Sequence, residues 1–137
     1  MSDDSFPFRH RLVVRFSDCD PMGHANHAIY FTYFEQCRLT WWRHLGSTTG
    51  LPGAATVIVH AACDYRAPAH VHEELEVRLK LGAIGRTSVT LSYEIVNVAT
   101  GQRLAEGQTV NVTLDPATRQ AIQVPDATRL LLQRGSP

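Results

Sequence analysis

The sequence predicts an α+β domain in which a curved antiparallel β-sheet is wrapped around one long central helix. One segment carries apolar side chains at helical spacing, and several later segments alternate apolar and polar residues, as antiparallel strands with one buried face do. The chain of 137 residues contains no repeat, linker or low-complexity run, so we expect a single domain covering residues 1–137. One apolar helix packed on such a sheet buries the apolar surfaces of both.

The first two predicted elements are a strand and the long helix. The strand covers residues 12–17, where Leu12, Val14 and Phe16 share one face. The helix follows at about residues 27–45, because apolar and aromatic side chains recur there at three- and four-residue steps. At 1.5 Å per residue this helix would be roughly 28 Å long.

Four further strands are predicted after the helix. They cover residues 56–65, 74–81, 87–96 and 104–114. The third of the chain's five predicted strands, "ELEVRLKL", shows the alternation most clearly, and turn-forming Gly, Pro and Asp residues lie in the connections. The segment "PDATRLLLQR" near the end predicts a short helix or a tail.

The charge balance argues against a nucleic-acid-binding protein. Basic and acidic residues number 13 each and the isoelectric point is near 7.1, so no strongly basic face is expected. The opening "MSDDSFPFRH" is acidic where a signal peptide is basic, and no segment approaches the roughly 20 apolar residues that span a bilayer. Three cysteines without CxxC spacing indicate reduced thiols. We therefore expect a cytoplasmic protein without membrane contact.

The stretch "SDCDPMGHANHAIY" gathers five chemically reactive side chains: Asp18, Cys19, Asp20, His24 and His27. A zinc site is one interpretation, but the Cys-x-Asp and His-x-x-His spacings do not match common structural zinc sites, and no second ligand pair follows. A second interpretation is a polar turn in which the carboxylates only cap and solvate the chain.

An acyl-transfer site is the third interpretation of this stretch. The segment "PMG" predicts a turn, and Asn26 is a favoured N-cap residue for the helix that follows. Free backbone N–H groups would then lie around His27 and Ala28, at the positive end of the helix dipole. Asp20 could attack a carbonyl held there, or take a proton from the attacking water. On these physical grounds alone, the capped turn and the acyl-transfer site both stay open.

The longer stretch "VRFSDCDPMGHANHAIYFTYFEQCR" resembles the signature of the 4-hydroxybenzoyl-CoA thioesterase family, within the hotdog-fold superfamily. That signature has an aromatic residue ending a strand, then Asp-x-Asp, Gly-His, Asn, Tyr and Phe-Glu-x-x-Arg. The matching residues are Phe16, Asp18, Asp20, Gly23, His24, Asn26, Tyr30, Phe34, Glu35 and Arg38. Weaker similarity continues through "DYRAPAHVHEELEVRLKL", "GRTSVTLSYEI" and "AEGQTVNVTLD". The resemblance implies the hotdog fold, a sheet wrapping a long helix.

The resemblance also implies catalytic roles. Asp20 matches the catalytic carboxylate of the family, and the backbone N–H of His27 matches the group that polarises the thioester carbonyl. The family often has Asn at this second position and one acyl-CoA thioesterase branch has His; either leaves the N–H available. The His27 imidazole could also help to protonate the leaving thiolate or orient water. For Tyr30, a place in the acyl pocket and a packing role both stay open.

Other motif residues are expected to support the site. We assign Asp18 to structure, as an acceptor for backbone N–H groups in the turn, and we expect His24 to pack or hydrogen-bond there. Glu35 and Arg38 are spaced to form an ordinary ion pair on the helix. Because helix acids at the subunit interface participate in related enzymes, Glu35 remains a minor catalytic candidate.

The segment "GRTS" matches a strand entrance where family members contact the nucleotide or pantetheine of CoA. Arg86 could pair with a phosphate there, and Thr87 and Ser88 could donate hydrogen bonds. A hairpin with a solvated arginine is the alternative. Arg119 and Arg129 are weaker phosphate candidates. We expect no metal or redox cofactor, because coenzyme A is part of the substrate.

We therefore expect an acyl-CoA thioesterase that hydrolyses the thioester to a carboxylic acid and CoA. The family implies a homodimer or homotetramer with the site at the subunit interface, and one short sheet leaves an edge to be paired. Two alternatives stay open: a hotdog hydratase or dehydratase using Asp20 with His24 and His27, and a non-catalytic acyl-CoA-binding module. The acyl group, the carrier thiol (CoA or acyl-carrier protein) and the nucleophilic or general-base role of Asp20 also stay open.

Overall fold

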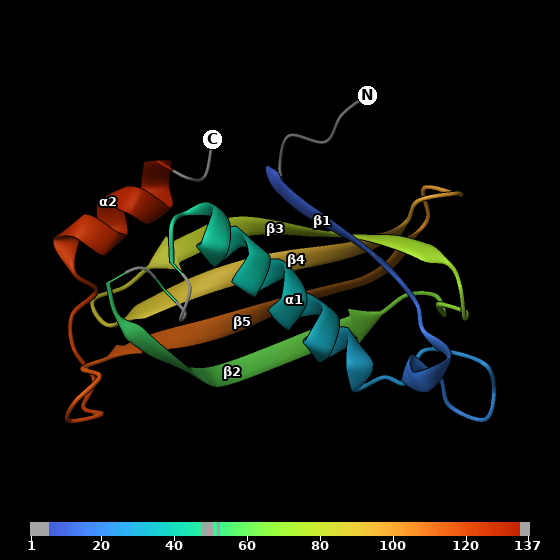
Figure 1. Cartoon of the computed structure of the whole chain (residues 1–137), viewed down its shortest axis with the longest axis horizontal. Coiled ribbons are helices and arrows are strands. Elements are labelled where there is room, and N and C mark those ends of the chain that lie inside the picture. The colour runs from blue at the N-terminus through green and yellow to red at the C-terminus, as the bar shows by residue number, and fades with distance from the viewer. Residues whose placement is uncertain (1–5, 48–50, 52, 135–137) are drawn as a thin grey trace.

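Five strands form one antiparallel sheet, and a long helix lies across one face of it (Figure 1). The structure, a computed structural model, describes residues 6–47, 51 and 53–134. Its elements are β1 (Phe8–Val13), η1 (a 3-10 helix, Phe16–Asp18), α1 (Ile29–His44), β2 (Ala55–Tyr65), β3 (Glu74–Ile84), β4 (Ser88–Asn97), β5 (Arg103–Leu114) and α2 (Asp126–Arg134). The strand order is β1-β3-β4-β5-β2. The predicted antiparallel sheet with a long helix is confirmed, and the segment predicted as a short helix or a tail forms the short helix α2.

The first strand lies earlier in the chain than the alternation predicts. β1 ends at Val13, and the predicted strand residue Phe16 lies in η1 with 84% of its surface exposed. The cause is local, because the Asp18 carboxylate accepts a hydrogen bond from the backbone N–H of Arg15 at 3.1 Å and closes a tight turn. Such side-chain bonds to the backbone compete with the strand ladder.

α1 packs closely on the sheet through its aromatic side chains. The ring of Phe34 stacks on Tyr93 of β4, with 4.5 Å between the ring centroids. Gly107 of β5 makes this approach possible, since a Cβ atom there would come within 2.5 Å of the Phe34 ring. The core is thus formed between α1 and the middle of the sheet.

β2 is an open edge of the sheet. It pairs with β5 on one side and with no described strand on the other. Its Val57, Ile58 and Val59 side chains are exposed even though they lie on both faces. An edge of this kind offers unpaired backbone groups and apolar surface to another strand.

The sheet has two distinct ends. At one end, β2 finishes at Tyr65, β3 begins at Glu74 and the N-terminus of α1 lies beside them (Figure 1). At the other end, the β3–β4 hairpin contacts α2 and the segment before it, since Arg129 of α2 donates to the carbonyl of Gly85 and the backbone N–H of Val124 donates to the carbonyl of Arg86. No helix among the described residues is long and apolar enough to cross a membrane.

Candidate active site

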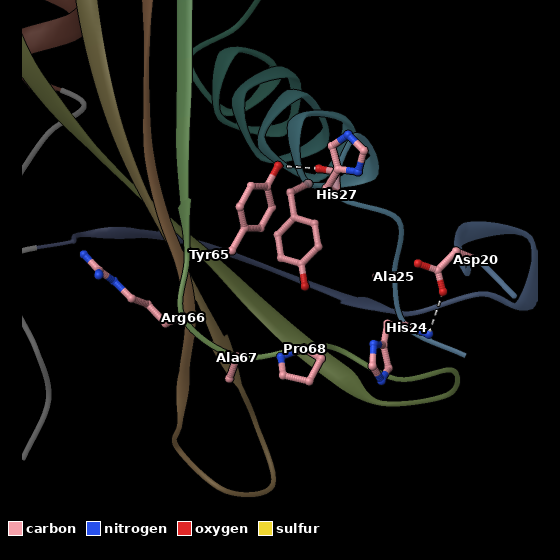
Figure 2. A pocket seen from close by; sticks show the side chains of 9 residues that line it. Asp20, His24, Ala25, His27, Tyr65, Arg66, Ala67 and Pro68 are labelled. Carbon is pink, nitrogen blue, oxygen red and sulfur yellow. Dashed lines mark hydrogen bonds between the residues drawn. The ribbon is translucent and has the colours of Figure 1, made fainter. Parts of the chain in front are cut away.

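A pocket of about 380 Å³ opens beside the N-terminus of α1 (Figure 2). Its lining comes from the loop before α1, the first turn of α1 and the end of β2 with the segment that follows. The lining residues are Asp20, His24, Ala25, His27, Tyr30, Tyr65, Arg66, Ala67 and Pro68. The structure therefore brings the predicted residues Asp20, His27 and Tyr30 together in one pocket.

Asp18 holds the loop that leads to this pocket. Its buried carboxylate accepts hydrogen bonds from the Arg15 guanidinium at 2.9 Å and the Tyr33 hydroxyl at 2.8 Å, besides the Arg15 backbone N–H. Burial would raise the pKa of Asp18, but the hydrogen bonds from Arg15 and Tyr33 outweigh it and keep the pKa below its ordinary value. Asp18 thus ties the end of β1 to α1, and its predicted structural role is confirmed.

One carboxylate oxygen of Asp20 is hydrogen-bonded within the turn, and the other has no hydrogen-bond donor among the described residues. Its Oδ1 accepts hydrogen bonds from the backbone N–H group of Met22 at 2.9 Å and from that of His24 at 3.3 Å. Figure 2 shows the bond from His24. Gly23 permits this turn with a φ of 82°. No residue that the structure describes donates a hydrogen bond to Oδ2. The carboxylate is therefore held in one orientation with an oxygen available to a ligand.

α1 begins later than predicted, and this changes which backbone N–H groups are free at the site. The N-cap is Ala28, and Asn26 lies two residues earlier. Asn26 still satisfies the helix start, because its Oδ1 accepts the Ala28 N–H at 3.0 Å and its carbonyl accepts the Ile29 N–H at 2.9 Å. The expectation that the Ala28 N–H is free is therefore wrong. The N–H of His27 has no acceptor among residues 6–47, 51 and 53–134.

Tyr65 is a pocket residue to which the sequence pattern did not point. Its hydroxyl donates a hydrogen bond to the carbonyl oxygen of His27 at 2.6 Å (Figure 2). Its ring meets Tyr30 edge-on, with 5.0 Å between the centroids. Burial raises the pKa of Tyr65 to about 12, so the phenol is protonated at neutral pH. The available signal was a tyrosine at the end of a strand within "DYRAPAH", but a strand pattern does not show which distant residue such a side chain meets.

Tyr30 and His24 both pack within the fold. Tyr30 lines the pocket and is also buried against Tyr33, so its packing role is observed, while its contact with an acyl group stays a prediction. The His24 ring packs edge-on against His70, with the centroids 4.9 Å apart. The expected packing of His24 at the turn is confirmed.

Glu35 and Arg38 lie further along α1 and do not line the pocket. They form the predicted ion pair at 3.9 Å, with Glu35 exposed and Arg38 buried. Arg38 also donates to the Tyr93 hydroxyl at 3.2 Å, inside the core. Arg38 therefore links α1 to β4, and Glu35 pairs with it from the exposed side.

Arg86, Thr87 and Ser88 lie at the other end of the sheet. The strand β3 separates this hairpin from the pocket, and 11 residues of strand span roughly 35 Å. Within one chain, the structure does not bring these residues to Asp20. Their contact with CoA stays a prediction.

The weaker phosphate candidates Arg119 and Arg129 are not in the pocket either. The Arg129 guanidinium donates to the carbonyl oxygens of Gly85 at 2.9 Å and Ile84 at 3.4 Å, and so holds the β3–β4 hairpin against α2. Arg119 is an exposed residue in the loop after β5 and has a positive φ of 62°.

The described residues contain no group of three or more His, Cys, Asp or Glu side chains arranged to hold a metal ion. Of the five reactive side chains in the "SDCDPMGHANHAIY" stretch, Asp18 is buried in the core, whereas Asp20, His24 and His27 line the pocket. The expectation that the reaction needs no cofactor stays a prediction.

Comparison with known proteins places this chain in a family. Residues 14–132 match the model of the Thioesterase-like superfamily. The chain belongs to this superfamily. The thioesterase is 32% identical over 122 residues to the uncharacterized protein YsmA of Bacillus subtilis (strain 168), a match that covers 89% of this chain and 82% of YsmA. It is 30% identical over 112 residues to YbgC of Escherichia coli O6:H1, named an acyl-CoA thioester hydrolase, with 80% of this chain and 83% of YbgC covered.

The fold agrees with the same assignment. The crystal structure of a thioesterase from Thermus thermophilus, complexed with coenzyme A and Zn, superposes with a TM-score of 0.87 at 28% identity. The superposition covers 96% of each chain. The resemblance to hotdog-fold thioesterases is therefore confirmed over nearly the whole length of the protein.

Proposed function

We propose that this thioesterase hydrolyses acyl-CoA thioesters to a carboxylic acid and CoA, with Asp20 and the His27 N–H as its reacting pair. One observation carries the proposal. Asp20 and His27 line the same pocket, and among the described residues Oδ2 of Asp20 has no hydrogen-bond donor and the N–H of His27 has no acceptor. The acyl-CoA thioester hydrolase relative and the coenzyme A-bound structure support this substrate class.

The two groups suit the two halves of the reaction. The His27 N–H, at the positive end of α1, donates to the thioester carbonyl oxygen and stabilises the negative charge that develops there. Asp20 then acts in one of two ways. As a general base, it takes a proton from the water whose oxygen bonds to the carbonyl carbon, and returns this proton to sulfur as the C–S bond breaks.

As a nucleophile, Asp20 instead bonds its carboxylate oxygen to the carbonyl carbon. The CoA thiolate leaves and takes a proton from solvent, and water hydrolyses the resulting mixed anhydride. Both routes consume one water and give the same acid and thiol. In a single turnover in ¹⁸O-labelled water, a product acid without label would establish the nucleophilic route with water attack on the Asp20 carbonyl carbon, because the acid then carries an Asp20 oxygen. A labelled acid is expected from the general-base route and from water attack on the acyl carbon of the anhydride.

Thiol release from a panel of aliphatic and aromatic acyl-CoAs tests the activity. We expect turnover by the wild-type protein and a loss of at least about 100-fold in kcat for Asp20→Asn. Asp126→Asn, an exposed carboxylate at the start of α2, is the matched control and should behave as wild type. Loss of enoyl absorbance without thiol release, or saturable binding without hydrolysis, would contradict the proposal and favour a hydratase or a binding module.

The assembly we propose is a homodimer formed along β2. Val57, Ile58 and Val59 expose apolar surface on this edge, and Tyr65 at its end lines the pocket. Antiparallel pairing of β2 with its copy would bring the Ala55 end of one subunit to the Tyr65 end of the other. The hairpin of one subunit would then approach the pocket of its partner, which would let Arg86 act across the interface. A homotetramer and a cytoplasmic location remain predictions.

A mixture of two impaired variants tests this arrangement, one expected to have lost turnover and the other to have an elevated KM. Chains carrying Asp20→Asn and chains carrying Arg86→Ala are mixed, dissociated and reassociated. If the CoA contact crosses the interface, each mixed dimer contains one site with both residues intact, and part of the activity returns with the wild-type KM. Activity with only the elevated KM of Arg86→Ala would show that the contact does not cross.

A further inference from the structure

We infer that Tyr65 is a positioning residue for thioester hydrolysis, because its hydroxyl fixes the peptide next to the His27 N–H. The inference rests on the proposed role of that N–H as the donor to the thioester carbonyl. It adds a residue from the edge strand β2 to the two proposed reacting groups, Asp20 and the His27 N–H, which both come from the loop before α1.

The peptide between His27 and Ala28 is held at both ends. Its oxygen accepts the Tyr65 hydroxyl at 2.6 Å, and its N–H donates to Oδ1 of Asn26 at 3.0 Å. Because a peptide unit is planar, these two bonds together fix its orientation. Neither bond uses the N–H of His27, which stays available to the pocket.

The peptide on the other side of His27 is also held. The carbonyl of Asn26 accepts the Ile29 N–H at 2.9 Å, which directs the His27 N–H away from the helix. His27 therefore lies between two fixed peptides. Of the three hydrogen bonds that hold these two peptides, those of Asn26 with Ala28 and Ile29 lie within the helix start, and the third comes from Tyr65.

The Tyr65 bond is thus the one of these three hydrogen bonds that links the helix start to the sheet. Its ring adds contacts to Tyr30 at 5.0 Å and to the His27 ring at 6.5 Å between centroids. The phenol remains protonated at the pH of an ordinary assay, so it is a donor throughout. Loss of the hydroxyl should let the His27–Ala28 peptide rotate and weaken the alignment of the neighbouring N–H with the substrate carbonyl.

Tyr65→Phe is the direct test, since it removes the hydroxyl and keeps the ring. We expect kcat to fall by about tenfold, while KM changes less than about twofold. Tyr93→Phe is the matched control: it removes a hydroxyl that bonds Arg38 and Thr109 in the core, away from the pocket. That variant should lower the melting temperature without lowering kcat. If Tyr65→Phe is fully active and Tyr65→Leu is impaired, the ring alone matters and the inference is wrong.

The carbonyl stretch of bound substrate gives a readout that packing alone would not move. In the Asp20→Asn background the thioester persists, and its infrared C=O band should lie below that of free acyl-CoA. Adding Tyr65→Phe should shift the band back toward the free value. An unchanged band would overturn the inference even if kcat had fallen.

Thermal unfolding shows whether Tyr65→Phe is folded. If it is not, Asn26→Ala removes the other tie on the same peptide, and an unchanged kcat in that variant would overturn the inference. Failure of the proposed function is distinguishable: it appears as absence of hydrolysis by the wild-type protein, or as full activity of Asp20→Asn. Failure of this inference alone appears as normal Asp20 dependence with a fully active Tyr65→Phe.

Discussion

The two ends of the sheet carry similar polar residues but use them differently. At the hairpin end, polar groups bond to each other: Arg129 donates to two carbonyls, and the Thr113 hydroxyl contacts the carbonyl oxygens of Thr87 and Ile122. At the α1 end, Oδ2 of Asp20 and the N–H of His27 have no partner among the described residues. Asp20 is half-buried and His27 is exposed, so both groups are open to a ligand that enters the pocket, whereas the bonded groups at the hairpin end are not.

The same contrast separates two carboxylates that are two residues apart. Both oxygens of Asp18 are occupied by Arg15 and Tyr33, whereas Asp20 keeps one oxygen free of any described donor. Asp18 is buried, and Asp20 lines the pocket. One acid therefore stabilises the loop, and the other is available to react.

The largest expected effect is the loss of kcat on substitution of Asp20, compared with substitution of Arg86 at the other end of the sheet. Asp20→Ala should lower kcat by about 1000-fold with little change in melting temperature, because the lost group acts on the reacting atoms. Arg86→Ala should leave kcat within about twofold of wild type and act on KM. Steady-state kinetics of both variants check this. A comparable loss of kcat in Arg86→Ala would break the distinction between the two ends.

The next effect concerns Asp18. Asp18→Asn should lower the free energy of unfolding by about 2 kcal/mol, because the partly buried bonds from the Arg15 guanidinium and backbone to the Asp18 carboxylate are weakened. The pKa of Asp18 is lowered in the folded protein, so its contribution is present above about pH 4 and is lost as the pH falls further. Urea unfolding between pH 3 and 6 should therefore show a steeper loss of stability for wild type than for the variant. Parallel curves would count against this role.

A smaller effect is expected at the hairpin. Arg129→Ala should lower the free energy of unfolding by about 1 kcal/mol, since it removes the bonds to Ile84 and Gly85. The activity of the folded variant should stay near that of wild type. Urea unfolding and thiol-release assays measure the two quantities. A raised KM without loss of stability would instead indicate that Arg129 contacts the substrate.

The smallest effect is expected for His27→Ala. The backbone N–H survives this substitution, so kcat should fall only about threefold. Thiol-release kinetics over a range of pH check it. A loss as large as that of Asp20→Ala would mean that the imidazole, and not the backbone, performs the essential step.

The sequence by itself determined the elements with a regular period and the loop motif. α1 was predicted at residues 27–45 and spans Ile29–His44, and β5 was predicted at residues 104–114 and spans Arg103–Leu114. These elements are encoded by side chains a few residues apart, which the chain places on one face whatever the rest of the fold does. The motif likewise placed Asp20 and His27 at the helix start.

Only the tertiary structure decided which distant groups meet there. Tyr65 reaches the His27 carbonyl across 38 residues, because β2 ends beside the first turn of α1. Arg86 is carried to the far end of the sheet by the direction of β3. The early end of β1 arises because the bonds between Arg15 and Asp18 outweigh a short alternation. Sheet register and helix placement are non-local, so a single strand pattern does not contain them.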